Sequence, residues 1–121
     1  MILVAAWKRV VLERYALFSG RAGRAEFWWF FLANLIVGAI LSILGRAATI
    51  FVILYALYGL ALIIPSLAVS IRRLHDIGRS GWWILIGLIP IVGVIVLLIF
   101  HATAGEPQPN AYGPTPPPLA A

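Results

Sequence analysis

The sequence contains no cysteine and few charged residues for its length. Without cysteine, disulfides, thiolate metal sites and cysteine nucleophiles are all excluded. Charged residues make up 11% of the 121 residues, against roughly a quarter in ordinary soluble domains. Hydrophobic residues make up 63%, and the mean hydropathy is +1.02. A soluble domain this small could not bury so much apolar surface, so the composition predicts a chain embedded in lipid.

The balance of charge is basic, with 9 Lys and Arg against 4 Asp and Glu and a net charge of +5. In a soluble protein this excess would suggest a nucleic-acid partner. Here the basic residues lie beside apolar segments rather than on a polar surface, so no nucleic-acid binding is expected. Anionic membrane lipids are the predicted partners. A membrane-protein partner or a homo-oligomer is the further alternative.

Three apolar runs dominate the chain, over about residues 27–44, 47–71 and 82–100. Each is long enough for a helix to cross about 30 Å of hydrocarbon, which takes roughly 20 residues. Backbone groups in lipid must be paired within their own segment, so the runs predict helices. Pro65 and Pro90 lie inside the second and third runs and are expected to kink them. The predicted fold class is all-α: a single polytopic membrane domain over residues 1–104 with three transmembrane helices.

The two ends of the chain differ from these runs. In residues 1–18, Trp7, Val10 and Tyr15 recur at helical spacing near one face, while charged residues occupy much of the rest. This pattern predicts an amphipathic helix that lies in the membrane interface. Residues 105–121 are rich in proline and glycine and cannot propagate a helix, so we expect an extended tail.

Basic residues are distributed unevenly among the segments between the apolar runs. They gather before residue 27 and in the 72–81 loop, whereas the loop between the first two runs holds only Arg46 and the tail holds none. Cytoplasmic loops carry the excess of Lys and Arg in membrane proteins. The sequence therefore predicts a cytoplasmic N-terminus and a cytoplasmic 72–81 loop. With three crossings, the tail would lie on the outer side.

A polar and aromatic motif precedes the first apolar run. Arg21 and Arg24 are followed by Glu26, and then by Trp28 and Trp29. Guanidinium groups meet phosphates where a helix enters a bilayer, and Trp rings settle at headgroup depth. Glu26 can pair with a neighbouring arginine or favour the start of the helix through its dipole. The motif predicts an interfacial anchor, with a specific lipid or partner site as the alternative.

A second motif connects the second and third apolar runs. Arg72 and Asp76 are four residues apart and can pair on a helix, while Arg73, three residues from Asp76, competes for the same carboxylate. Gly78 is placed to end the helix, and Ser80 to cap the next one. The further candidates in this segment are one cation and two interfacial anchors: Arg79, Trp82 and Trp83.

His75 stands next to Asp76, a pairing that invites an enzymatic interpretation. Such a pair needs a nucleophile, a substrate or a metal to act upon, and the nearby serines lie in no recognised nucleophile motif. The His, Asp and Glu residues also show no familiar ligand spacing for a metal. His101 is expected near the opposite interface, out of reach of His75. A structural histidine is therefore predicted, with no catalytic residue, metal site or cofactor.

Both motifs and the tail resemble those of a bacterial family catalogued as domain of unknown function 805. The matching stretches are residues 18–29 (FSGRAGRAEFWW), residues 72–83 (RRLHDIGRSGWW) and residues 105–114 of the tail. Gly23 stands where the family often carries a basic residue, and Ala111 where it commonly carries an arginine. The resemblance implies an integral protein of the bacterial inner membrane, and it implies no catalytic mechanism.

Three functions fit these observations. Small size, absent catalytic sets and a notched face at Gly87, Pro90 and Gly93 favour a non-enzymatic accessory, regulatory or assembly component of a larger membrane complex. The alternatives are binding of an anionic lipid or lipid-linked headgroup, and a membrane enzyme that uses a His–Asp pair. The predicted functional face is cytoplasmic and comprises Arg21, Arg24, Glu26, Arg72, Arg73, His75, Asp76 and Arg79.

Overall fold

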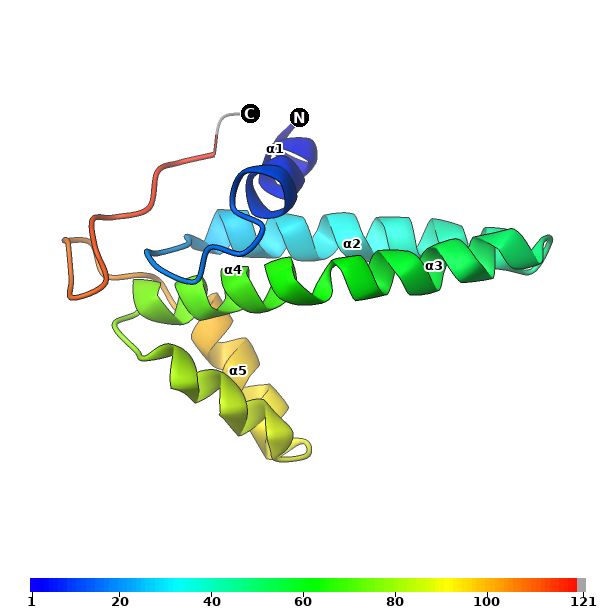
Figure 1. Cartoon of the computed structure of the whole chain (residues 1–121). Helices are drawn as coiled ribbons and strands as arrows, with labels where there is room; N and C mark the ends of the chain where they lie inside the picture. The colour runs from blue at the N-terminus through cyan, green and yellow to red at the C-terminus, as the bar shows by residue number, and fades with distance from the viewer. Residues whose placement is uncertain (120–121) are drawn as a thin grey trace.

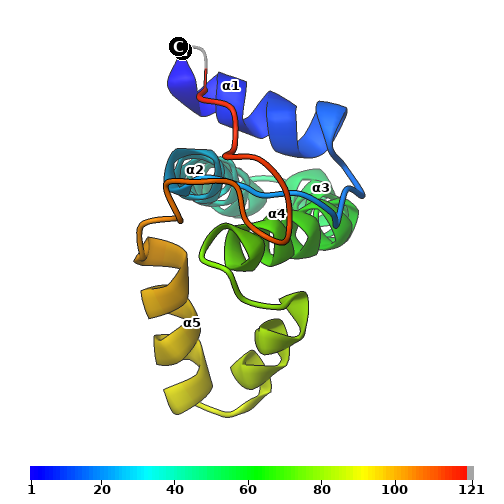
Figure 2. The same cartoon turned by 90° about the vertical axis from the view of Figure 1, so that its left-hand side faces the viewer.

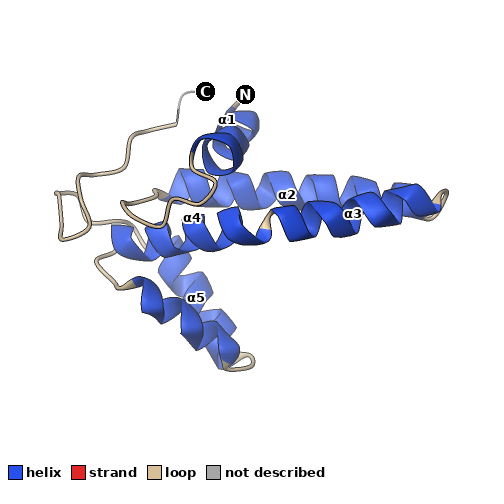
Figure 3. Ribbon diagram, viewed as in Figure 1, coloured by secondary structure: helices blue, strands red, loops and turns tan. Residues whose placement is uncertain are grey.

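The computed structural model describes residues 1–119, which form helices and loops and one isolated backbone bridge between Asn110 and Gly113. The all-α prediction is confirmed over this range. Residues 14–23 and 103–119 are loops (Figure 3). In chain order the helical segments are α1 (Ile2–Lys8), η1 (Arg9–Glu13, a π-helix), α2 (Arg24–Gly45), α3 (Thr49–Ala61), α4 (Ile63–Asp76), η2 (Gly81–Leu88, a 3₁₀-helix) and α5 (Val92–Ala102).

Helix α2 is the longest element of the fold (Figure 1). Its 22 residues span about 33 Å at 1.5 Å per residue, enough to cross the hydrocarbon of a bilayer. Only 6% of its most apolar stretch is buried, whereas a core helix of a soluble protein is mostly buried. Among residues 1–119, α2 is the one unbroken helix that is long and apolar enough to cross a membrane.

The second apolar run forms two helices, α3 and α4, that meet at Leu62 with a bend of 40°. Pro65 explains the break, because its nitrogen cannot donate to the carbonyl of Ala61 one turn earlier. The hydroxyl of Tyr15 donates to that carbonyl at 2.5 Å and replaces the missing bond. Taken as one bent span, α3 and α4 are also long and apolar enough to cross a membrane, antiparallel to α2 (Figure 1).

Residues 82–100 do not form the predicted transmembrane helix. They divide into η2 and α5, which pack side by side as a hairpin (Figures 1 and 2). The chain reverses at Ile91, whose φ of 66° and ψ of −67° describe a γ-turn. The Val92 amide closes this turn by donating to the Pro90 carbonyl at 2.7 Å. Because Pro90 breaks the helix in mid-run, arms of 8 and 11 residues replace one crossing, and each arm is too short to span a bilayer.

The glycines of this segment serve the hairpin itself. A Cβ at Gly93 would collide with the carbonyl of Ile86, and a Cβ at Gly87 would lie 2.8 Å from a methyl carbon of Leu97. The two arms therefore approach closely because both positions lack a side chain. The notched face that was expected to receive a partner helix is filled by the chain's own second arm.

The C-terminal tail returns to the end of the molecule where α2 begins and α4 ends. Viewed along α2, the tail runs over this end from α5 toward α1 (Figure 2). The amide of Glu106 donates to the carbonyl of Asp76 at 2.8 Å and ties the tail to the end of α4. The tail and the 72–81 loop were predicted on opposite sides, whereas in the structure they lie at the same end of the bundle, because the third run turns back. That this shared side is cytoplasmic stays a prediction.

The N-terminal helical segment, α1 followed directly by η1, ends at Glu13 rather than at residue 18. It runs across α2 (Figure 1). Ala6 and Val10 are fully buried in an apolar cluster with Phe30 of α2, whereas Val4 faces outward. One face of the segment therefore packs on the bundle and the other remains exposed. Its location in the membrane interface stays a prediction.

Candidate functional site

The polar residues of the two motifs meet at the end of the bundle where α2 begins and α4 ends. We call these five residues the arginine cluster: Arg21, Glu26, Arg72, Arg73 and Asp76. All five side chains are buried, and those of Arg72 and Arg73 are fully so. The structure therefore brings together five of the eight residues predicted for the functional face. Burial also removes these five side chains from contact with solvent and lipid.

Asp76 is the centre of the arginine cluster. Its Oδ1 accepts from Arg21 Nε at 2.9 Å, and its Oδ2 accepts from Arg73 Nη1 at 2.8 Å. Each oxygen thus has a charged donor, which a buried carboxylate requires. Of the two arginines predicted to compete for Asp76, Arg73 binds it and Arg72 does not. The reason is direction, because Arg73 and Asp76 both lie against the tail whereas Arg72 faces α2.

Arg72 reaches Glu26 on α2, with Nη1 2.5 Å from Oε2. The other oxygen, Oε1, lies 3.6 Å from Arg9 Nη1 and 3.8 Å from Arg14 Nη1. These two contacts are ion pairs without hydrogen bonds. Within residues 1–119, neither Glu26 Oε1 nor Arg72 Nη2 has a hydrogen-bond partner. Three cations therefore surround one carboxylate, and the surroundings of Glu26 carry an excess of positive charge.

Arg21 and Arg73 also bind the backbone of the tail. Arg21 donates to the carbonyls of Glu106 at 2.5 Å and Gln108 at 2.8 Å. Arg73 donates to the carbonyl of Thr103. An extended proline-rich segment has no internal hydrogen bonds for its carbonyls. The guanidinium groups supply these bonds from their five donors each, so the arginine cluster fixes the tail on the end of the bundle.

His75 and Asp76 do not bond to each other. His75 Nδ1 lies 2.9 Å from the carbonyl oxygen of Gly20, and its ring stacks on Tyr112 of the tail with centroids 4.1 Å apart. Asp76 is saturated by its two arginines, so it is not placed to orient a catalytic histidine. In the described part of the chain, no three His, Asp or Glu side chains gather as metal ligands.

His101 lies beside α4, where the sequence did not place it. Its Nε2 is 2.5 Å from Ser70 Oγ, and its Nδ1 is 2.6 Å from the carbonyl oxygen of Leu97. Burial lowers the pKa of His101 below its ordinary value; the charge of Arg73 acts in the same direction, and the Leu97 bond opposes both. A neutral ring that donates a hydrogen bond from Nδ1 to the carbonyl of Leu97 accepts a hydrogen bond at Nε2 from the hydroxyl of Ser70. Local sequence carries no signal for this contact, since it depends on the chain reversal at Pro90.

The two remaining predicted cations lie outside the arginine cluster. Arg24 is exposed, and its Nη1 is 3.4 Å from the carbonyl oxygen of Ala102. The guanidinium carbon of Arg79 lies 5.0 Å from the ring centroid of Trp83 and 4.4 Å from that of Phe100. Arg79 thus makes cation–π contacts with both arms of the hairpin.

The four tryptophans predicted as interfacial anchors divide into two groups. Trp29, Trp82 and Trp83 are exposed. Trp28 is half-buried, and its indole nitrogen donates to the carbonyl of His101 at 3.1 Å. Trp28 therefore joins α2 to the end of α5, whereas the other three face outward.

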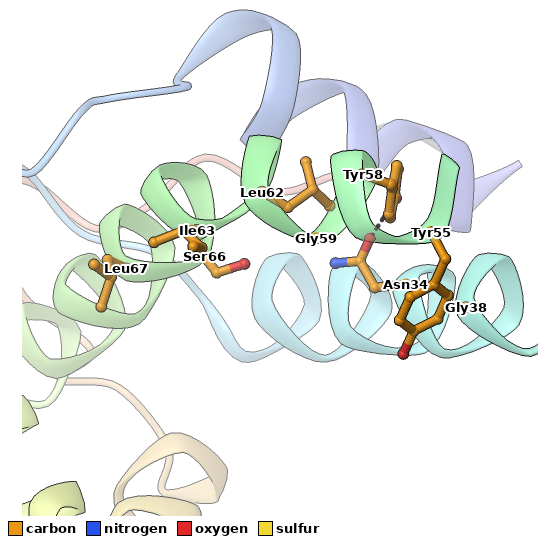
Figure 4. Close-up of a pocket in the computed structure, with 9 residues that line it drawn as sticks. All are labelled: Asn34, Gly38, Tyr55, Tyr58, Gly59, Leu62, Ile63, Ser66 and Leu67. Carbon is orange, nitrogen blue, oxygen red and sulfur yellow. Dashed lines mark hydrogen bonds between the residues drawn. The ribbon is translucent and has the colours of Figure 1, made fainter. Parts of the chain in front are cut away.

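A second candidate site is a groove between α2 and the bent pair α3–α4 (Figure 4). The groove has a volume of about 440 Å³ and mainly apolar walls. Tyr58 donates to Asn34 Oδ1 at 2.6 Å and accepts from Trp7 Nε1 at 2.9 Å, which links α3 to α2 and α1. The Asn34 amide nitrogen and the Ser66 hydroxyl face into the groove (Figure 4), and neither has a hydrogen-bond partner among residues 1–119.

Comparison with known proteins places these features in a family. Residues 15–114 match the family described as "Protein of unknown function (DUF805)". The chain belongs to this family. It is 46% identical over 111 residues to the inner membrane protein YhaI of Escherichia coli K12, a match that covers 91% of this chain and 94% of YhaI. It is 41% identical over 115 residues to the inner membrane protein YhaH of the same strain, with 91% of this chain and 95% of YhaH covered. No solved structure matches the chain.

Membership in DUF805 confirms the family that the sequence motifs resemble, and both of these relatives are named as bacterial inner membrane proteins. The residues matched to the family contain the whole arginine cluster, the hairpin and the tail through Pro114. Arg9 and helix α1 precede them. The names of YhaI and YhaH state a location and no activity.

Proposed function

We propose that this chain is a non-enzymatic accessory component of a larger complex in the bacterial inner membrane. A transmembrane helix of the partner protein occupies the groove between α2 and the α3–α4 pair. The observation that carries this proposal is the unpaired Asn34 amide nitrogen and Ser66 hydroxyl on the groove walls. The arginine cluster serves the same function indirectly, because it holds the elements around the groove in one arrangement.

Lipid tails and a protein helix differ in what they offer these two polar groups. Hydrocarbon supplies no hydrogen-bond partner, so an amide or hydroxyl that faces it stays unpaired at a cost of about 1–3 kcal/mol in proteins. A helix with a polar side chain at the matching depth supplies one. Gly59 lines the same groove and has open space where a side chain would stand, which lets a helix backbone approach. The groove is therefore better matched to a polar-bearing helix than to lipid.

Site-specific photocrosslinking in intact bacterial cells tests this proposal. A photoreactive residue at Ile63, which lines the groove, should give a protein adduct of one defined mass. The same probe at Ile40, an exposed α2 residue that does not line the groove, should give none. Ser66→Ala removes one groove donor without touching the Tyr58–Asn34 bond and should weaken the adduct. Adducts to lipid alone at Ile63, or equal protein adducts at both positions, would contradict the proposal. An adduct between two copies of this chain would contradict a separate partner protein and show a homodimer instead.

The excess positive charge around Glu26 supports a second candidate function, the binding of an anionic lipid headgroup. Arg21, Arg72 and Arg73 are already paired inside the chain, so the set available to a phosphate is smaller than the sequence predicted. Arg14 contacts Glu26 only as an ion pair at 3.8 Å, and it lines a cleft of about 270 Å³ between the 14–21 loop and the tail. A phosphate there would offset the unbalanced cations.

Native mass spectrometry of the chain with phosphatidylglycerol separates headgroup binding at this cleft from general attraction. Arg14→Gln should lose the retained lipid. Arg46→Gln removes an exposed cation from the turn after α2, at the other end of the bundle, and should retain it. Equal retention by the two variants would rule out a specific site at Arg14.

A further inference from the structure

The two ends of the molecule differ in width. At one end lie α1, η1, the start of α2, the end of α4, and the base of the η2–α5 hairpin (Figure 1). At the other end lie only α2 and α3, joined by the turn at 46–48. Viewed along α2, α1 and the hairpin extend to opposite sides of the central helices (Figure 2). We call these the wide end and the narrow end.

The hairpin is long enough to enter one leaflet and too short to reach the other. The 8 residues of η2 and the 11 residues of α5 each rise about 16 Å, against a hydrocarbon thickness of about 30 Å. The hairpin also runs obliquely from α4, and its tip lies short of the narrow end (Figure 1). Its apolar surface therefore belongs in the leaflet that holds the wide end.

The residues at the tip and the base of the hairpin identify lipid as what covers it. At the tip, Leu88 is 80% exposed and Ile91 is 74% exposed. At the base, Trp82 is exposed, and Arg79 lies over the Trp83 ring. Tryptophan and arginine at the base of an apolar segment are the residues that sit at headgroup depth while the tip lies in hydrocarbon.

The hairpin is held rigidly enough to displace lipid. Its arms meet through Gly87 and Gly93, where an added Cβ would collide with the opposite arm. Its base is fixed by Arg73, whose Nε donates to the carbonyl of His101 at 3.0 Å, and by Trp28, which donates to the same carbonyl. A rigid apolar body confined to one leaflet increases the area of that leaflet relative to the other.

From this asymmetry we infer that the chain is a membrane wedge that accumulates where the bilayer bulges toward its wide end. With α2 and the α3–α4 pair as the two crossings, the leaflet of the wide end holds α1, the hairpin and two helices, whereas the opposite leaflet holds two helices only. A bilayer that is convex on the side of the tail spreads the lipids of that leaflet and accommodates the extra volume. The binding surface is the lipid leaflet itself, so this inference does not depend on the partner helix proposed above.

Counting single vesicles of different sizes tests the inference. The full chain with one introduced cysteine is reconstituted into vesicles of phosphatidylethanolamine and phosphatidylglycerol, and a membrane-impermeant dye labels only outward-facing cysteines. Thr115→Cys reports molecules with the tail outside, and Ala47→Cys reports molecules with the narrow end outside. The density of tail-outside molecules should be at least about two-fold higher in vesicles of about 50 nm than in vesicles of about 400 nm. The density of narrow-end-outside molecules should change in the opposite direction.

This reversal of sign does not require any variant to fold differently. Equal densities at all diameters, or the same trend for both labels, would overturn the inference. Leu88→Ser with Ile91→Ser removes apolar surface from the exposed tip and should bring the density ratio close to one. The matched control is Ile43→Ser with Ile50→Ser, which removes exposed apolar surface at the narrow end and should keep the wild-type ratio. A tip variant that kept the wild-type ratio would show that the hairpin is not the wedge.

Discussion

Arg21 and Asp76 are separated by 55 residues in the chain, yet Arg21 Nε donates to Asp76 Oδ1 at 2.9 Å in a fully enclosed ion pair. This contact joins the loop before α2 to the end of α4. The same two residues hold the tail, Arg21 through the carbonyl of Glu106 and Asp76 through the amide of Glu106. The motif residues therefore assemble the end of the bundle.

Asp76→Asn should destabilise the protein strongly. The substitution leaves Arg21 and Arg73 buried without their counter-charge, and breaking a buried pair in this way costs about 3–5 kcal/mol. The measurement is thermal unfolding in detergent, compared with Glu13→Gln, which changes an exposed carboxylate. Equal unfolding temperatures for the two variants would show that the arginine cluster does not stabilise the fold.

Gly105→Ala should release the tail. A Cβ at position 105 would collide with both carboxylate oxygens of Asp76, so either the tail or the arginine cluster must move. Limited proteolysis should cleave the variant after residue 105 faster than the wild type. Ala104→Ser changes the exposed neighbour and should leave the cleavage rate unchanged. Equal protection of the two variants would mean that the close contact at Gly105 does not hold the tail.

Tyr15→Phe should destabilise the bend between α3 and α4 by about 1 kcal/mol, because it removes the donor to the Ala61 carbonyl. In a Pro65→Ala background an amide can donate to this carbonyl, so the same change should cost less. The double-mutant cycle is measured by thermal unfolding. Additive effects would mean that the hydroxyl does not replace the bond that Pro65 removes.

Features set within one segment of the chain could be predicted from the sequence, whereas contacts between distant segments could not. The helix over α2 and the break associated with Pro65 follow from hydropathy and proline chemistry within one segment. The grouping of Arg21, Glu26 and Arg72 into one region also followed, because all were placed on one membrane face. The partners within that region did not follow, since the choice of Asp76 by Arg73 depends on the position of the tail.

The third apolar run shows why the prediction of a third long helix differs from the structure. Hydropathy measures whether a segment prefers lipid, and the residues on either side of Pro90 do so whether the segment crosses or turns back. The direction of the chain was decided by one γ-turn at Ile91 and by close packing at Gly87 and Gly93. The misplacement of His101 and of the tail followed directly from that reversal.

Stability should fall as the pH is lowered through the ordinary pKa of histidine. The pKa of His101 is lowered in the folded state, so below about pH 6.5 the unfolded chain binds a proton that the folded chain does not. This protonation stabilises the unfolded state relative to the folded state. The stabilising contribution is present above this pH and is lost as the pH falls. Thermal unfolding between about pH 7.5 and pH 5.5 should show a smaller loss for His101→Gln than for the wild type. An identical pH dependence in both proteins would mean that His101 does not contribute to it.

The hairpin is tested most directly by the side of the membrane on which the tail lies. The natural chain has no cysteine, so single cysteines at Thr115, Ala16 and Ala47, all exposed, can be labelled without background. An impermeant maleimide is applied to spheroplasts and to inverted membrane vesicles. We expect Thr115→Cys and Ala16→Cys to react from the same side and Ala47→Cys to react from the opposite side. Labelling of Thr115→Cys together with Ala47→Cys would show that residues 82–100 cross the membrane and would contradict the hairpin.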